Sequence, residues 1–292
     1  MVEDERETLR LSEMVATRLG GIEGVEAVAL GGSWARGEAH PNSDVDLGIY
    51  YHPERPPRIA SLRLLARELD NRHPPEAVTN FGEWGPWING GGWLTIDGQN
   101  TDWLYRDLAL VERTINECCA GHPSVHYQPG HPHGFHTHIY MGEVHYCLIL
   151  YEQNGGLSAL KRLTEEYPLR LKRALVNSQL WEAGFALETS RKSAERGDSF
   201  YVAGCLFRCA ACLVQVLFAL NERYLINEKG SVAATDNLPL RPEDFRETVE
   251  SVLACPGKTS KQLVSNIRRL EEITKVVEKL CAEPLRDPEN SA

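Results

Sequence analysis

Two aspartates, Asp44 and Asp46, stand one residue apart at the start of an apolar segment that ends at Tyr51. Side chains alternate between the two faces of a strand, so a strand starting at Asp44 would direct both carboxylates to one face. Adjacent carboxylates repel each other, and a cation relieves that repulsion. Magnesium commonly binds one or two carboxylates together with substrate phosphates. The pair therefore predicts a magnesium site, with two solvated acids at a strand start as the alternative.

The residues before this pair predict a place for phosphate. Gly31 and Gly32 permit tight backbone geometry, and Ser33 stands where a short helix would begin, eleven positions before Asp44. Backbone N–H groups at the start of a helix bind phosphate oxygens. A phosphate cradle beside a pair of metal-binding carboxylates describes a site for a nucleoside triphosphate and magnesium.

This pattern resembles the signature of the DNA polymerase beta-like nucleotidyltransferase superfamily, with Gly32 and Ser33, then a loop, then Asp44-x-Asp46 and an apolar residue. The resemblance covers about residues 25–108. It implies a mixed-sheet head of the kind found in stand-alone enzymes similar to the kanamycin and lincosamide nucleotidyltransferases. No comparably sharp motif follows in the rest of the chain, so the resemblance does not carry over a substrate.

The superfamily also uses a third carboxylate on a later strand, and Asp102 is the best match because it stands in the middle of the second strand of a predicted hairpin. Asp97 is a poorer candidate because it precedes Gly98 in the predicted turn, and Asp107 would lie on the opposite face from Asp102. The resemblance implies that Asp44, Asp46 and Asp102 hold two magnesium ions. The acids would align the α-phosphate of a nucleoside triphosphate for attack by an acceptor hydroxyl, with release of pyrophosphate.

Three further residues are candidates from position alone. Arg36 could contact the phosphates or be a solvated arginine at a helix end, and Lys229, beside a glycine, could reach a triphosphate or be solvated. Glu143 could serve as the general base, as a glutamate of the helical part does in kanamycin nucleotidyltransferase-like enzymes, or it could be an acid favoured by a helix start.

The periodicity predicts a head with strands and helices over residues 1–120 and an α-helical domain over residues 121–292. The resemblance implies that the fold class is α+β with a small mixed-sheet head, and that the helical domain contributes to acceptor binding. In the head, expected strands span 25–30, 44–51, 93–97 and 100–108, and expected helices span 5–19, 33–38, 59–69 and 108–119. Beyond the head only helices are expected, at 141–151, 156–167, 169–196, 199–224, 242–254 and 260–281.

The histidines and cysteines leave alternatives open. Six histidines fall within residues 122–138, where prolines and glycines predict an irregular loop that could bind metal, line a substrate site or be structural. Cys205, Cys209 and Cys212 have the spacing of an iron–sulfur motif, but on an apolar helix they share one face and are expected to pack in a core. The glycine-rich loop with Trp84, Trp87 and Trp93 could stack on a base or an acceptor ring.

Composition limits the partners. The net charge of −10 argues against nonspecific binding to nucleic acid. The acidic start of the chain does not resemble a signal peptide, and Arg208 and Gln215 interrupt the most apolar run, so we expect a cytoplasmic protein with reduced thiols and no membrane span. The acceptor, the preferred base and the oligomeric state stay open. A protein acceptor, as for antitoxin-like enzymes, and a non-catalytic nucleotide-binding module are the alternative functions.

Overall fold

The computed structural model describes residues 3–40 and 43–282, and these form two compact units. Of the described residues, the first unit comprises 3–40, 43–116, 125–130 and 134–166, and the second comprises 117–124, 131–133 and 167–282. The chain therefore returns to the first unit after residue 120 and stays there to residue 166. The predicted boundary between the head and the helical domain is at residue 120.

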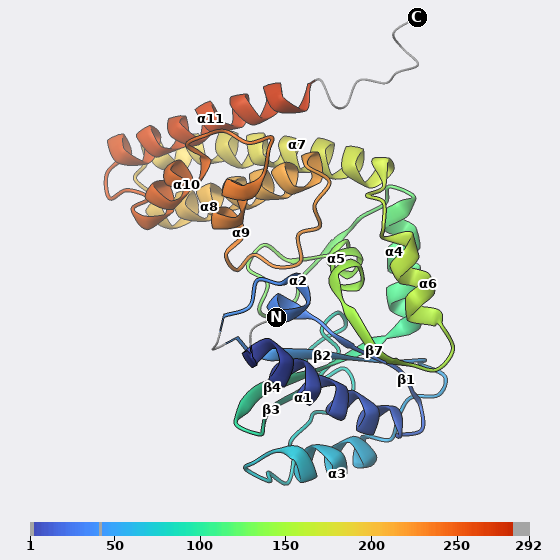
Figure 1. Ribbon diagram of the computed structural model, residues 1–292. Helices are drawn as coiled ribbons and strands as arrows, with labels where there is room; N and C mark the ends of the chain where they lie inside the picture. The colour runs from blue at the N-terminus through green and yellow to red at the C-terminus, as the bar shows by residue number, and fades with distance from the viewer. Residues whose placement is uncertain (1–2, 41–42, 283–292) are drawn as a thin grey trace, which may run out of the picture. The chain divides into compact units, whose positions relative to one another are not determined.

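A five-stranded mixed sheet organises the first unit (Figure 1). Its order is β3-β4-β2-β1-β7, with β2 and β4 parallel and all other neighbours antiparallel. The strands are β1 (Val25–Leu30), β2 (Val45–Tyr51), β3 (Gly91–Ile96), β4 (Gln99–Asp107) and β7 (Leu148–Glu152). The mixed sheet and the helices that follow confirm the predicted α+β class.

One face of this sheet is covered by α1 (Glu3–Gly20) and α3 (Ile59–Leu69), which lie on the same side in Figure 1. Alternate residues of β2 point into this layer, and Leu47 and Ile49 are fully buried there with Trp103 and Tyr105 of β4. Burial of apolar side chains on a single face fixes the strand register, because a slip of one residue would turn the whole set outward. The polar alternates of β2 and β4 must therefore occupy the other face.

The opposite face carries α2 (Gly32–Arg36) and α5 (Ile139–Tyr146), and α2 packs against both β2 and α5. The β3–β4 hairpin turns at Asp97 and Gly98, whose φ angles of 49° and 80° are both positive. A two-residue turn of this kind matches the right-handed twist of the strands, which is why the Asp-Gly pair predicts it.

The helix predicted over residues 141–151 is wrong in its second half. The helix α5 ends at Tyr146, and β7 follows at Leu148 and pairs with the edge of β1. The segment LILYE has no clean alternation of apolar and polar residues, and a short apolar run can form either a helix or a strand. Pairing with β1 decides the outcome, because it satisfies backbone groups at an otherwise open edge.

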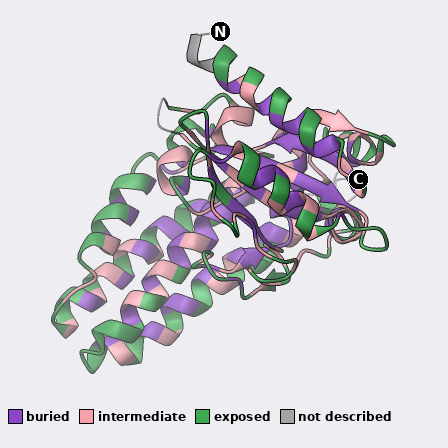
Figure 2. Cartoon of the chain, turned by 90° about the horizontal axis from the view of Figure 1, so that it is seen from below, coloured by how far each residue is buried: buried purple, intermediate pink, exposed green. Residues whose placement is uncertain are grey.

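Other helices follow the predicted periodicity closely. They are α4 (Leu108–Cys119), α6 (Gly156–Leu163), α7 (Leu169–Glu195), α8 (Ser199–Leu220), α10 (Phe245–Ala254) and α11 (Ser260–Cys281). A further short helix, α9 (Ser231–Ala234), was not predicted. In the second unit, α8 packs against α7, α10 and α11, and Figure 2 shows the long helices with buried and exposed residues alternating along them. The predicted irregular loop contains a small ladder of β5 (Val125–His126) and β6 (Phe135–His136).

Among the described residues, α8 alone is long and apolar enough to cross a membrane. Of its most apolar eighteen-residue stretch, 61% is buried within the protein, as in the core helix of a helical bundle. Its cysteines behave as the spacing predicts, since Cys209 and Cys212 are buried and Cys205 is partly buried, and all three are free thiols.

Candidate active site

Asp46 and Asp102 are direct partners on adjacent parallel strands, β2 and β4. Neighbouring strands lie about 4.8 Å apart, so the two residues start side by side and their side chains share the face opposite α1 and α3. Both are partly buried, and Asp44, which lies just before β2, is exposed. The structure therefore brings the three predicted acids to one end of this strand pair.

Two side chains that the sequence does not single out hold the segment that leads into these acids. The indole Nε1 of Trp34 and the amide Nε2 of Gln99 both donate hydrogen bonds to the backbone oxygen of Ser43, at 3.2 and 2.8 Å. Ser43 directly precedes Asp44, so α2 and β4 together fix the approach to the exposed acid. No motif marks these two residues, because their role depends on contacts that form only in the fold.

Gly32 has no room for a side chain. Its φ of +61° is in the left-handed region, and a Cβ built on it would lie 1.8 Å from Oδ2 of Asp46. The neighbouring N–H of Gly31 donates a hydrogen bond to the backbone oxygen of Asp46, at 2.8 Å. The backbone at the start of α2 is thus pressed against the Asp46 carboxylate, which explains the glycine in the sequence motif.

Ser33 and Arg36 both lie on α2, as predicted, next to the acids in the same unit. Arg36 donates from Nε to Oε2 of Glu38 at 2.7 Å, and the Glu38 side chain is 63% exposed. Arg36 can leave Glu38 and bind a ligand instead at little cost in free energy, because surface ion pairs contribute about 1 kcal/mol or less. Phosphate contacts by Ser33 and Arg36 stay predictions.

Glu143 lies in the middle of α5 and not at a helix start. Both of its carboxylate oxygens accept hydrogen bonds from Arg106 of β4, from Nε and Nη2, each at 2.8 Å. Arg106 follows Asp102 by four residues on the same strand face, which places their Cα atoms about 13 Å apart. A role for Glu143 as general base also stays a prediction, and it would require the carboxylate to release Arg106.

The Arg106–Glu143 pair is an ionic contact in a buried setting. Arg106 is only 3% exposed, and its guanidinium also lies 5.9 Å from the centre of the Tyr140 ring. Burial lowers the pKa of Arg106, but the charge and hydrogen bonds of Glu143 outweigh this and raise it above its usual value. Burial has the opposite effect on the neighbouring Tyr50 and raises the pKa of its hydroxyl, with Cys147 and Glu143 adding to the effect. The Arg106–Glu143 pair joins α5 to β4, the strand that carries Asp102.

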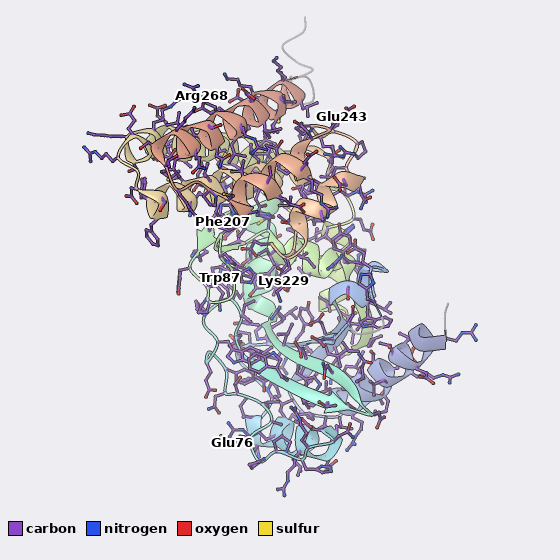
Figure 3. The ribbon with its side chains drawn as sticks, turned by 90° about the vertical axis from the view of Figure 1, so that its left-hand side faces the viewer. Glu76, Trp87, Phe207, Lys229, Glu243 and Arg268 are labelled. Carbon is purple, nitrogen blue, oxygen red and sulfur yellow. The ribbon has the colours of Figure 1, made fainter. Side chains whose placement is uncertain are left out.

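The tryptophans of the glycine-rich loop contact each other and the β5–β6 ladder. Trp84 and Trp93 stack at 4.5 Å between ring centres, and Trp87, labelled in Figure 3, stacks on His126 at 4.4 Å. Trp84 and Trp93 also line a cavity of about 540 Å³ with Arg63. The stacking of Trp87 is structural, and a ligand role for the other two stays a prediction.

The clustered histidines are divided between the two units. His126, His136, His138 and His145 belong to the first unit, and His122, His131 and His133 belong to the second. Lys229 is an exposed residue of the second unit, on the segment between α8 and α9 (Figure 3). Its predicted contact with a triphosphate stays a prediction.

The acids at the ends of β2 and β4 have the donor chemistry that magnesium requires. Asp46 and Asp102 offer carboxylate oxygens from neighbouring positions, and Asp44 offers another beside them. Hard divalent cations prefer such all-oxygen sets, and adjacent carboxylates lose their mutual repulsion when a cation binds. These residues fit a divalent metal whose remaining ligands come from substrate phosphates.

Comparisons with known proteins give matches to two family models. Residues 10–82 match the model of the nucleotidyltransferase domain family, and residues 139–229 match a domain of unknown function, DUF4037. No curated protein matches the sequence. The solved structures that are similar include a nucleotidyltransferase-like protein from Exiguobacterium sibiricum 255-15, which is 10% identical, with a TM-score of 0.45 over 93% of this chain and 77% of that one.

Proposed function

We propose that this chain, which carries a nucleotidyltransferase domain of the DNA polymerase beta-like superfamily, transfers a nucleoside monophosphate from a nucleoside triphosphate to a hydroxyl of a small molecule. The observation that supports this proposal most is the side-by-side placement of Asp46 and Asp102 next to the start of α2. It joins a carboxylate pair to a backbone segment suited to phosphate.

The proposed reaction forms one bond and breaks one bond at the α-phosphorus. The oxygen of the acceptor hydroxyl attacks, the bond to the bridging oxygen of the β-phosphate breaks, and pyrophosphate leaves. When bound, magnesium would neutralise the charge that develops on the phosphates. Asp44, Asp46 and Asp102 would hold it, and Gly32 and Ser33 would place the phosphates against it.

The chain itself positions the acids. Because Gly32 lies against Asp46 and the Ser43 carbonyl is held by Trp34 and Gln99, the acids are positioned before any ligand binds. A site that is already arranged loses less conformational entropy on binding. We therefore expect the metal and the triphosphate to bind without folding of this segment.

The test is transfer of label from α-labelled nucleoside triphosphates in the presence of magnesium. Purified protein is incubated with a pool of hydroxyl-bearing small molecules in one arm and with proteins in another, and the products are separated by size. We expect label in small-molecule products, and loss of that label in Asp46→Asn and Asp102→Asn. Label in a protein band would instead indicate a protein acceptor, and nucleotide binding without transfer in either arm would indicate a non-catalytic module.

A further inference from the structure

A second group of side chains that could bind a metal lies in the second unit. It is distant in sequence from Asp44, Asp46 and Asp102. His133 comes from the loop after β5, Glu182 from α7 and Cys212 from α8. The ligand atoms that these three residues offer all lie within 4.8 Å of one another. His133 and Cys212 are buried, and Glu182 is partly exposed.

The spacing of the two buried donors is that of ligands on one metal ion. Nε2 of His133 and Sγ of Cys212 are 3.5 Å apart. Zinc binds thiolate sulfur at about 2.3 Å and imidazole nitrogen at about 2.0–2.1 Å, and two such ligands at a tetrahedral angle lie about 3.6 Å apart. The two atoms could therefore contact a shared zinc ion with almost no movement.

The chemical character of the three donors also selects the metal. Sulfur and imidazole nitrogen favour zinc and related transition metals over magnesium. A thiolate and a carboxylate together balance the charge of a divalent cation, so the bound group would be neutral. This matters because two of the three donors are buried, and an unbalanced buried charge is costly.

The histidine is positioned by contacts that do not involve a metal. Oε1 of Glu228 accepts a hydrogen bond from the backbone N–H of His133 at 3.1 Å, and the other oxygen of Glu228 contacts Nδ1 of His131 at 3.2 Å. The His133 ring also lies edge-on to the ring of Phe207 on α8 at 6.5 Å (Figure 3). The loop is thus fixed to the helices with Nε2 directed at the thiol.

Glu182 is held in place as well. Arg208 of α8 donates its hydrogen bonds to Oε1 of Glu182, and a carboxylate can bind a metal through Oε2 while Oε1 keeps its arginine. The alternative is a hydrogen-bonded histidine–cysteine pair beside a salt bridge, without a metal.

We propose that His133, Glu182 and Cys212 bind a zinc ion that fastens the residue 131–133 loop to α7 and α8, with the fourth coordination position left to water. Three protein ligands and a water are the arrangement found in catalytic zinc sites, whereas structural sites usually have four protein ligands. This proposal does not depend on the proposed transferase function, because it uses none of the residues placed at the acids.

The experiment is a metal titration of the full-length protein. The variant Asp46→Asn/Asp102→Asn serves as background, so that zinc cannot occupy the carboxylate site. After removal of metals with a chelator, the protein is titrated with Zn²⁺ by calorimetry and with Co²⁺ by absorption spectroscopy. We expect one tight site per chain, and a cobalt–thiolate charge-transfer band, which requires a cysteine ligand.

The matched variants locate that site. Cys212→Ser and His133→Gln should each weaken zinc binding by more than about 100-fold, since loss of an outer-shell partner alone typically costs about 10–100-fold. Cys205→Ser and His122→Gln, which change a cysteine and a histidine of the same unit outside the group, should keep the site. The absence of the thiolate band in the background protein, in which all three proposed ligands are intact, would overturn the proposal. Equal zinc affinity in Cys212→Ser and Cys205→Ser would also overturn it.

Discussion

Gly32 and Gly37 stand at the two ends of α2, and both have positive φ angles, of 61° and 69°. A Cβ at Gly37 would meet nothing within 4 Å, whereas one at Gly32 would collide with the carboxylate of Asp46. Alanine in a left-handed conformation costs about 1–2 kcal/mol. We expect Gly37→Ala to lose about this much stability and to keep its activity.

Gly32→Ala should lose transferase activity in addition, because the new methyl group displaces Asp46. Urea unfolding and initial rates of transfer measure the two effects on each variant. Equal activity of the two alanine variants would contradict the close packing of Gly32 against the acid.

The acids themselves give a second test at this scale. Asp102→Asn keeps the shape of the side chain and removes the charge that binds the cation, so transfer should fall by at least about 100-fold with little change in unfolding. Asp97→Asn is the matched control, since Asp97 lies in the hairpin turn with a positive φ that asparagine also tolerates. Initial rates at saturating magnesium measure the effect, and a similar loss in both variants would argue against the assignment of Asp102.

At the scale of residues, the sequence predicts that the acids lie close together, because strand alternation and a short motif both act locally. The Asp-Gly pair indicates the turn and so favours Asp102 over Asp97. The sequence could not show that Arg106 holds Glu143 or that Gln99 holds Ser43, because these contacts join residues 37 and 56 positions apart. The contact of Trp34 with Ser43 spans nine positions, but no motif marks it. Likewise, the helical spacing of Cys212 predicts its burial and says nothing of His133, 79 positions away.

At the scale of elements, the Arg106–Glu143 pair attaches α5 to β4. Removing one partner of a buried ion pair leaves an uncompensated charge and costs about 3–5 kcal/mol. We expect Glu143→Gln to destabilise the protein by about 3 kcal/mol, measured by urea unfolding. Glu38→Gln removes the partner of the more exposed Arg36 and should change stability by about 1 kcal/mol or less.

These variants also separate the two roles of Glu143. If it acts only through Arg106, activity per folded molecule should be nearly kept in Glu143→Gln. A large loss of kcat per folded molecule at unchanged stability would instead support the general-base prediction.

A contact at the end of α3 gives an acid dependence of stability. The Asp70 carboxylate is fully buried and accepts hydrogen bonds from Nε and Nη2 of Arg72, at 3.0 and 2.7 Å. Arg72 lowers the pKa of Asp70 below its usual value, although burial opposes the effect. The unfolded chain therefore takes up this proton first, so the stabilisation is present above about pH 4 and is lost as the pH falls through the folded pKa.

Comparison of the wild type with Asp70→Asn tests this dependence. The free energy of unfolding should fall less steeply between about pH 5 and pH 3 in the variant than in the wild type. Identical slopes would show that Asp70 does not titrate differently in the folded and unfolded states.

At the scale of the whole molecule, the return of β7 to the sheet sets the limit of the first unit. A fragment of residues 1–166 contains all five strands, whereas a fragment ending at residue 120 leaves the edge of β1 open. We expect the longer fragment to unfold cooperatively and the shorter one to aggregate or unfold at lower urea concentration. Circular dichroism during urea unfolding measures the difference, and equal stability of the two fragments would favour the boundary at residue 120.

The predicted layout of a mixed sheet followed by helices holds because hydrophobic periodicity reports on each element separately. The division into units does not follow from periodicity, since the pairing of β7 with β1 joins residues about 120 positions apart. The acceptor cannot be predicted from the sequence for a similar reason, because a binding surface assembled from segments distant along the chain would have no local motif.

The most direct test of the central claim follows both ends of the triphosphate in one reaction. The protein is incubated with magnesium, the small-molecule pool and ATP labelled at the α-position or at the γ-position. We expect α-label on the acceptor and γ-label in pyrophosphate, in equal amounts. Both products should be lost in Asp46→Asn/Asp102→Asn. Transfer of γ-label to the acceptor, or transfer that survives removal of both acids, would contradict it.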